Sequence, residues 1–398
     1  MNKVYSTPKV KKQRNLLKYG LSVIFMLLVL FVTLYFLLKD ASLEEIRRSL
    51  LLADLRWVTA GFALMLLHQL CVAEILRQML IQVVGVDPPY LTCLNTAFIG
   101  FYFNNITPSA TGGQPMEMYY LYRCKVDIAG SSIIFMVMTM LYNFALLIYG
   151  IFMYFWQHTL VSSSLFGLKY VLIFSIVFNL GLLLMCFGLT FFPHGFRKAC
   201  LSTLQFLLRH RLIRSSHVLQ RVERFFEQYS KSASQLWHSP ALLLRLCALS
   251  FLQLAALHLV PFCAGRALGA DASIFVPSIA LQAVLTLAAS GFPTPGAVGL
   301  TESGFVAMFS SVIPAAKVMP AMILTRVINL YAFLLLSGLL TILAFMTAGS
   351  QHSHMRRVRS AADPVVLPEA NISEIQNKEA KNTPEDKQKI QNQKEIMC

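Results

Sequence analysis

Long apolar stretches separated by short polar or charged segments dominate the pattern of this 398-residue chain. A helix of about 20 apolar residues crosses the hydrocarbon core of a bilayer, which is about 30 Å thick. The pattern therefore predicts an all-α polytopic membrane protein with about six full spans. We place these spans at about 17–38, 57–82, 130–156, 166–192, 240–264 and 318–347.

Two further apolar regions are interrupted by proline and glycine. The first broken segment, residues 91–127, contains the sequence NNITPSATGGQPME at positions 104–117. The second broken segment, residues 273–312, contains GFPTPGAVG at positions 291–299. Irregular backbone at membrane depth is tolerated only where protein or a water-filled cavity surrounds it. Paired interruptions in the two halves of a chain are typical of the binding site of a transporter.

Basic residues gather in the N-terminal residues 1–16, in residues 196–238 and just after the last span. The positive-inside rule predicts that all three regions are cytoplasmic. An even number of crossings must then separate them, so each broken segment returns to the side from which it came. We therefore predict two re-entrant, Gly/Pro-broken helical hairpins, whose common order suggests an inverted repeat.

The remaining polar segments complete the predicted organisation. Residues 42–51 have the pattern of a short amphipathic helix at the membrane interface, and residues 196–238 that of a basic amphipathic helix on the cytoplasmic surface. The transmembrane domain is placed at 17–348. The polar tail, 349–398, lacks apolar periodicity and is expected to be disordered.

Composition changes how the net charge of +15 is interpreted. In a soluble protein this charge would favour a nucleic-acid partner, but 56% of the residues are hydrophobic and only 13% are charged. Soluble domains are about 45–50% apolar and about 25% charged. The charge therefore sets orientation, and no nucleic-acid partner is expected. We expect a multi-pass protein of the plasma membrane with both termini in the cytoplasm.

The sequence offers no familiar catalytic or metal-binding motif. Most of its eight cysteines lie in apolar runs without the spacing of metal ligands, which is typical of small core residues. It contains no G-x-x-x-x-G-K-[ST], G-x-S-x-G or H-E-x-x-H sequence. We expect no metal, no cofactor and no ATP hydrolysis by this chain.

Each interruption is followed by a glutamate and, further on, by an arginine. Ionisable side chains are costly in a membrane, and each is a functional candidate. Helix N-termini and arginine can hold a phosphate, carboxylates can hold an ammonium group, and glycines allow close approach. The candidate substrate-binding residues are Asn105, Pro108, Gly112, Gly113, Gln114, Glu117, Arg123, Pro295, Gly296, Gly299, Glu302 and Arg326.

The same residues admit a structural interpretation. Glu117 with Arg123, and Glu302 with Arg326, could be ion pairs that fix neighbouring helices, and the interruptions could be surface loops. Four polar side chains could serve as ligand contacts or as hydrogen bonds between helices: Asn104, Asn105, Gln114 and Asn329. The same ordering in two broken segments favours a binding site over this interpretation.

These motifs resemble the lysylphosphatidylglycerol synthase transmembrane-region family, also called the flippase-like domain family. Residues 105–108, 112–115 and 292–302 carry the resemblance, together with Arg326. It covers about residues 15–348. The resemblance implies a lipid flippase that moves lysyl-phosphatidylglycerol from the inner to the outer leaflet. Exposed lysyl lipid makes the surface less negative and repels cationic antimicrobial peptides.

The best-known members of this family, the multiple peptide resistance factors, carry a C-terminal cytosolic domain that makes the lipid from lysyl-tRNA and phosphatidylglycerol. Only about fifty residues follow the last span here, too few for such a domain. We therefore expect a translocator of an anionic or aminoacylated phospholipid, without synthase activity of its own. Two alternatives stay open: a phosphatidylglycerol lysyltransferase, and a membrane partner of a separate synthase. The sequence leaves homo-oligomerisation open.

Overall fold

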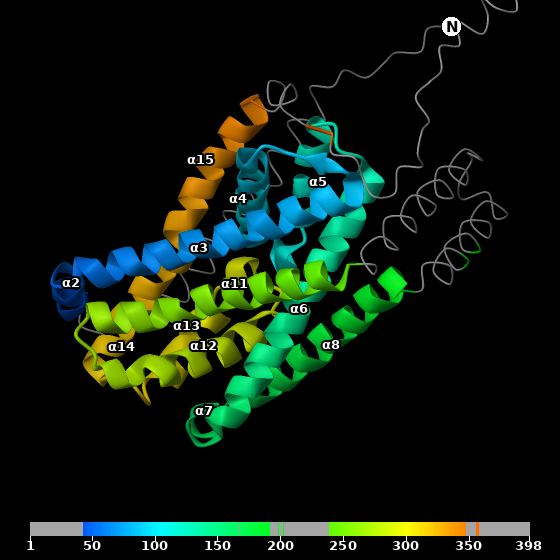
Figure 1. Cartoon of the computed structure of the whole chain (residues 1–398). Helices are drawn as coiled ribbons and strands as arrows, with labels where there is room; N and C mark the ends of the chain where they lie inside the picture. Colours follow the sequence, from blue (N-terminus) through cyan, green and yellow to red (C-terminus); the bar gives the residue numbers. More distant parts are fainter. Residues whose placement is uncertain are drawn as a thin grey trace, which may run out of the picture. The chain divides into compact units, whose positions relative to one another are not determined.

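The structure, a computed structural model, describes residues 43–165, 167–191 and 239–347, together with residues 198, 202, 356 and 357. Its architecture is helical, as predicted (Figure 1). The predicted span 17–38 lies outside the described residues, and so does nearly all of the 196–238 segment and of the 349–398 tail. Those predictions are untested.

Twelve helices of the described residues form the framework. In chain order they are α2 (Leu43–Leu51), α3 (Leu55–Met79), α4 (Tyr90–Ile106), α5 (Gly113–Arg123), α6 (Ile128–Trp156), α7 (His158–Ser164), α8 (Lys169–Phe191), α11 (Pro240–Ala267), α12 (Phe275–Ala289), α13 (Leu300–Phe309), α14 (Ala315–Arg326) and α15 (Ala332–Thr347). Short 3₁₀ turns and π-helical stretches join some of them. These are η1 (Leu80–Val84), η2 (Pro108–Ala110), η3 (Ala272–Ile274), η4 (Pro295–Ala297) and η5 (Val327–Tyr331). Two-residue strands β1 (Val86–Asp87) and β2 (Arg356–Arg357) pair antiparallel, Val86 opposite Arg357.

Six stretches of the described residues are long and apolar enough to cross a membrane. They are Leu55–Val84, Ile128–Trp156, Lys169–Leu189, Pro240–Ala267, Ala272–Ala289 and Ala315–Thr347. Five of them match predicted spans, whereas Ala272–Ala289 is the first arm of the second broken segment. The class of all-α polytopic membrane protein is therefore confirmed. The re-entrant course of the two broken segments stays a prediction.

Local sequence explains where the long helices begin and end. Asp54 caps α3 by accepting a hydrogen bond from the Arg56 amide at 2.9 Å. Asp127 caps α6 in the same way, from the Gly130 amide at 3.1 Å. A carboxylate at this position satisfies a free amide and complements the helix dipole. Gly85, with φ of 69°, ends the π-helical continuation of α3 because glycine adopts left-handed conformations without strain.

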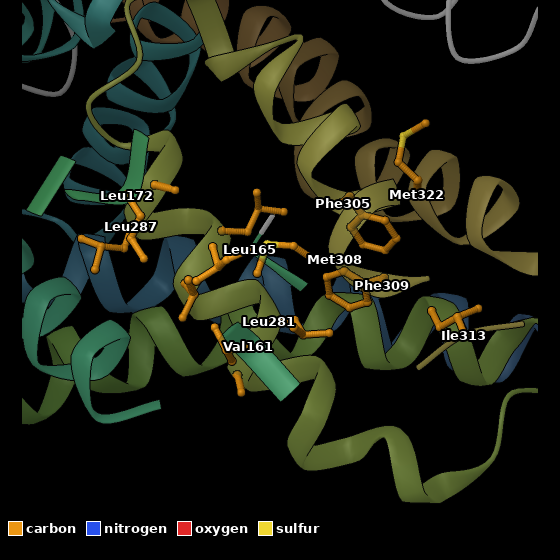
Figure 2. Close-up of a cluster of buried hydrophobic side chains, with 14 of the residues drawn as sticks. Val161, Leu165, Leu172, Leu281, Leu287, Phe305, Met308, Phe309, Ile313 and Met322 are labelled. Atoms are coloured by element: carbon orange, nitrogen blue, oxygen red, sulfur yellow. The ribbon is translucent and has the colours of Figure 1, made fainter. Parts of the chain in front are cut away.

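The interior is built by helices from both halves of the chain. Helix α3 packs along α11, and α6 packs against α8 and α12. Figure 2 shows buried apolar side chains from α7, α8, α12, α13 and α14 gathered in one cluster, which includes Leu281, Phe305 and Phe309. Large apolar side chains also face outward, among them Phe155 and Leu335. Such extensive apolar exposure is expected where lipid, not water, surrounds the helices.

Phe309 offers a test of this core. Its side chain is fully buried and stacks on Phe305 with ring centroids 4.0 Å apart. We expect Phe309→Ala to lower the free energy of unfolding by about 3 kcal/mol, because van der Waals contacts are lost and a cavity remains. Thermal unfolding of the protein purified in detergent measures the effect. Phe155→Ala is the matched control, since that ring is 71% exposed. Equal shifts for the two variants would contradict the packing described here.

Candidate functional site

The two interruptions share a sequence and a backbone path. Both read Thr-Pro-x-Ala, at Thr107–Ala110 and at Thr294–Ala297. Each threonine is extended, with ψ of 144° and 148°, and each proline begins a 3₁₀ turn. The next two residues have positive φ, 52° and 52° in the first turn and 60° and 50° in the second. The two copies of this four-residue sequence therefore have the same backbone conformation.

This conformation is costly for three of the four residues. Ser109, Ala110 and Ala297 carry a Cβ atom, and a left-handed conformation then costs about 1–2 kcal/mol per residue. Strained backbone of this kind persists only when the surroundings hold it, and it gathers at functional sites. The two turns are therefore candidates for a shared role rather than ordinary surface loops.

The two interruptions meet in space. Turn η2 contacts η4, and η4 also packs against α4. Asn105, near the end of α4, places Oδ1 3.5 Å from the position that a Cβ atom on Gly296 would occupy. Within each broken segment the two arms are also in contact, α4 with α5 and α12 with α13. The structure thus brings together two motifs whose convergence the sequence could not decide.

The second broken segment is closed by a buried ion pair. Arg326 Nε donates to Glu302 Oε1 at 2.6 Å, and the two side chains are 8% and 0% exposed. Arg326 Nη2 also donates to the carbonyl oxygen of Gly296 at 3.1 Å. Glu302 Oε2 accepts from the amide of Gly299 at 2.7 Å, which caps α13. Since both groups are occupied by the protein, they hold the turn in place and do not present a free charge.

Glu117 in the first broken segment has the opposite character. Its side chain is only 7% exposed, yet among the described residues no hydrogen bond or ion pair satisfies its carboxylate. The carboxylate lies against α4, where a Cβ atom on Gly100 would come within 2.0 Å of Oε1. A buried carboxylate without a partner is strongly disfavoured. Glu117 is therefore a group that can gain much from a cationic ligand.

The predicted Glu117–Arg123 pair does not form within the described residues. Arg123 is exposed at the end of α5, six residues after Glu117. Side chains six positions apart on a helix point to different faces, whereas partners three or four apart can meet. Of the two ion pairs that the structural interpretation proposed, the described residues therefore form only Glu302–Arg326.

The other candidates of the first broken segment mostly position α5. The Gly112 amide, just before α5, donates to Thr107 Oγ1 at 2.9 Å, which ties the start of this helix to the end of α4. A Cβ atom on Gly113 would lie 2.1 Å from Asn104 Oδ1, so glycine allows α5 to approach α4. Gln114 donates to Thr139 Oγ1 on α6. Pro108 is exposed, whereas its counterpart in the repeat, Pro295, is buried.

Several contributing residues escaped the sequence reasoning. The internal repeat Thr-Pro-x-Ala could have revealed Thr107 and Thr294, since both stand at the same place in the two motifs. Gly100 lies in an ordinary apolar stretch, and only the fold shows that Glu117 rests on it. Asn329, by contrast, was already a candidate from the sequence. It lies next to Arg326 in the π-helical η5, and its buried Oδ1 finds no hydrogen-bond partner in the described chain. Within that part of the chain, no three His, Cys, Asp or Glu side chains are grouped to hold a metal.

The contact between Gly100 and Glu117 gives a direct test of this geometry. We expect Gly100→Ala to force the Glu117 carboxylate out of its position, because the added methyl group would overlap Oε1. Lipid translocation, the activity expected from the sequence, should fall at least tenfold, with little change in the thermal unfolding temperature. The matched control is Gly181→Ala on α8, where an added Cβ atom meets nothing within 4 Å. Unchanged activity in both variants would mean that the carboxylate position does not matter.

The fold and the site together define a polytopic helical membrane protein in which two interrupted segments meet at their breaks. A family profile described as "Lysylphosphatidylglycerol synthase TM region" matches residues 19–337. The chain belongs to this family, as the resemblance of its motifs indicated. The match spans both broken segments, Glu117, Glu302 and Arg326. A search among curated proteins found no match to the chain.

Proposed function

We propose that this protein translocates a charged phospholipid between the two leaflets of the membrane. The observation that carries the proposal is the meeting of η2 and η4, together with the unpartnered carboxylate of Glu117, which is buried against Gly100 within the first broken segment. Broken helices at the junction of two halves are typical of sites that work by alternating access. A site of this kind supplies a polar path for a headgroup while lipid chains stay outside.

The two glutamates have different roles in this proposal, one structural and one in binding. Glu302 and Arg326 neutralise each other and keep the second turn rigid. Glu117 binds the cationic part of the headgroup, because a buried carboxylate without a partner gains the full benefit of an incoming ammonium group. The bound state is therefore electrically balanced, whereas in the empty site burial favours the neutral, protonated form of this carboxyl group. We expect the two turns to keep their shape and to move together with their helices between inward-open and outward-open states.

The substrate that fits this arrangement is an aminoacylated phospholipid, and lysyl-phosphatidylglycerol is the specific candidate. Its lysyl ammonium groups suit Glu117, and the family description contains the name of this lipid. Delivery of such a lipid to the outer leaflet of the plasma membrane would protect the cell from cationic antimicrobial peptides. With the termini in the cytoplasm, the lipid would enter from the side where a separate synthase makes it.

The same family description names a synthase, which favours one alternative. In that alternative the chain is a membrane partner of a separate phosphatidylglycerol lysyltransferase, or contributes to that reaction, and moves no lipid. Glu117 then has no substrate to bind, so an uncharged replacement should leave lipid synthesis and exposure unchanged.

Surface labelling of whole cells separates these functions. The cells would express a lysyl-phosphatidylglycerol synthase that lacks its own flippase region, with or without this protein. A membrane-impermeant, amine-reactive probe measures exposed lysyl lipid, and extraction measures the total. Translocation predicts more labelled lipid at unchanged total, and no such gain with Glu117→Gln. Glu44→Gln is the control, since that carboxylate is 80% exposed. A rise in total lipid instead would indicate a role in synthesis.

A further inference from the structure

A polar cleft lies apart from the two breaks, where the ends of several helices meet. It has a volume of about 670 Å³ and is lined by parts of α2, the start of α3, the end of α11, the loop 268–271 and the start of α14. Lys317 in its wall precedes Arg326 by nine residues on α14, which is about 13 Å of helix. Figure 1 shows α2 beside the start of α3, close to α14. The cleft is therefore a separate site.

Two cations line this cleft and are held by main-chain oxygens. Arg266 Nη1 donates to the carbonyl oxygen of Ala270 at 2.7 Å, and its guanidinium lies 5.2 Å from the centre of the Trp57 ring. Its Nε is buried and finds no hydrogen-bond acceptor in the described part of the chain. Lys317 Nζ makes one long hydrogen bond, 3.4 Å, to the Gly269 carbonyl oxygen. Both side chains are thus positioned, and both keep donors available for an anion.

Two carboxylates line the same cleft. Asp54 and Asp271 each accept one amide hydrogen bond, from Arg56 at 2.9 Å and from Ser273 at 2.8 Å. The Ser273 hydrogen bonds, with a smaller effect of Arg266, lower the pKa of Asp271, which is therefore ionised at neutral pH. Within the described residues, neither carboxylate forms an ion pair with Arg266 or Lys317. Opposite charges thus share one cleft without neutralising each other in direct contact.

The rim of the cleft is apolar and faces outward. Leu51, Leu52 and Leu55 are 74%, 74% and 72% exposed, and Leu52 itself lines the cleft. A short amphipathic helix with exposed leucines is typical of the membrane interface, and Trp57 beside it is the kind of residue that gathers there. Lipid chains can cover these leucines while a headgroup enters the charged cleft. The surroundings therefore point to the membrane as the source of the ligand.

We propose that this cleft binds the headgroup of a phospholipid that carries both a phosphate and a primary ammonium group. Arg266 and Lys317 hold the phosphate, Asp54 and Asp271 accept hydrogen bonds from the ammonium, and the acyl chains lie over the three leucines. Phosphatidylethanolamine has this chemistry, whereas phosphatidylglycerol lacks the ammonium group and phosphatidylcholine lacks its N–H donors. The inference concerns binding and holds whether or not the chain translocates lipid.

Trp57 supplies a local signal for the test. The chain has three tryptophans, so replacing Trp156 and Trp237 by phenylalanine leaves Trp57 as the only tryptophan, which can be excited selectively over tyrosine. The full-length protein would be placed in nanodiscs of phosphatidylcholine with increasing fractions of phosphatidylethanolamine or phosphatidylglycerol. We expect a saturable change in Trp57 emission with phosphatidylethanolamine and a response at least tenfold weaker with phosphatidylglycerol. Equal responses to the two lipids would overturn the proposal.

Single substitutions assign the roles within the cleft. Lys317→Gln should weaken the phosphatidylethanolamine response about tenfold, since a charge-assisted hydrogen bond is lost. Asp271→Asn should weaken the response to phosphatidylethanolamine and leave that to phosphatidylglycerol unchanged. Arg47→Gln is the control, because this nearby arginine is exposed and pairs only with Glu44 in the described structure. Arg266→Lys tests the role of Arg266. It keeps the positive charge, so it can replace an uncharged variant that fails to fold. No effect of Lys317→Gln would overturn the proposal.

Soluble competitors distinguish a lipid site from a simple anion site. In detergent, glycerophosphoethanolamine should compete with short-chain phosphatidylethanolamine, whereas inorganic phosphate should compete at least tenfold less well. Equal competition by inorganic phosphate would reduce the cleft to an anion site and overturn the lipid assignment. Glu117→Gln should keep normal binding at Trp57 even though it loses translocation. Failure of one proposal is thus distinguishable from failure of the other.

Discussion

Glu117→Gln is expected to reduce lipid translocation about a hundredfold without destabilising the protein. Glutamine keeps the shape of the side chain but removes the charge that would attract an ammonium group, and loss of a desolvated ion pair costs about 2–5 kcal/mol. The free protein gains from the same change, because a buried and unpartnered carboxylate disappears. The thermal unfolding temperature should therefore stay the same or rise.

The measurement is translocation of a fluorescent lysyl lipid in proteoliposomes, combined with thermal unfolding in detergent. Glu44→Gln on α2 removes one negative charge from an exposed position and should change neither value. Full translocation by the Glu117→Gln variant would remove this carboxylate from the mechanism. A lower unfolding temperature would show that the carboxylate has a structural partner.

Breaking the Glu302–Arg326 pair should have the largest effect on stability. Each single replacement, Glu302→Gln or Arg326→Gln, leaves a buried charge without its counterpart, which costs about 3–5 kcal/mol. Arg326→Gln also removes the hydrogen bond to the Gly296 carbonyl oxygen and so loosens the second turn. The double variant should recover much of the loss, because neither charge is then left alone.

A double-mutant cycle by thermal unfolding isolates the coupling between the two side chains. Arg326→Lys should restore only part of the stability, since one ammonium group cannot reach both Glu302 and Gly296 in the same geometry. The control cycle uses Glu44 and Arg47, an exposed pair whose atoms are 3.6 Å apart, and it should show no measurable coupling. Additive effects in the Glu302–Arg326 cycle would contradict the buried pair.

Together the two predictions separate the two halves of the site. The second broken segment, held by the Glu302–Arg326 pair, is expected to lose stability when one of these charges is removed. The first broken segment, which carries the unpartnered Glu117, is expected to lose function without losing stability. The shared Thr-Pro-x-Ala turns support an internal repeat, yet the charges that follow them have diverged. If both broken segments carried such a buried ion pair, both turns would be held in place, but no carboxylate would remain free to bind a ligand.

Much of the architecture was predictable from local pattern. Five of the six predicted spans coincide with long apolar helices, because a helix that faces lipid must be apolar over its whole length. The interruptions were also visible, since proline and glycine break helices wherever they occur in number. Both broken segments are indeed helix, turn and helix. Their course relative to the membrane was inferred from charge counts and stays a prediction.

The sequence by itself determined the class of protein, the position of most spans, the two breaks and the set of charged candidates. These properties depend on residue type and on short-range geometry. Only the tertiary structure decided that the breaks touch, that Arg326 is bound to Glu302, and that Glu117 lies buried on Gly100 without a partner. The partners in each of these contacts come from different segments of the chain. Their meeting depends on how whole helices pack, which no local pattern encodes.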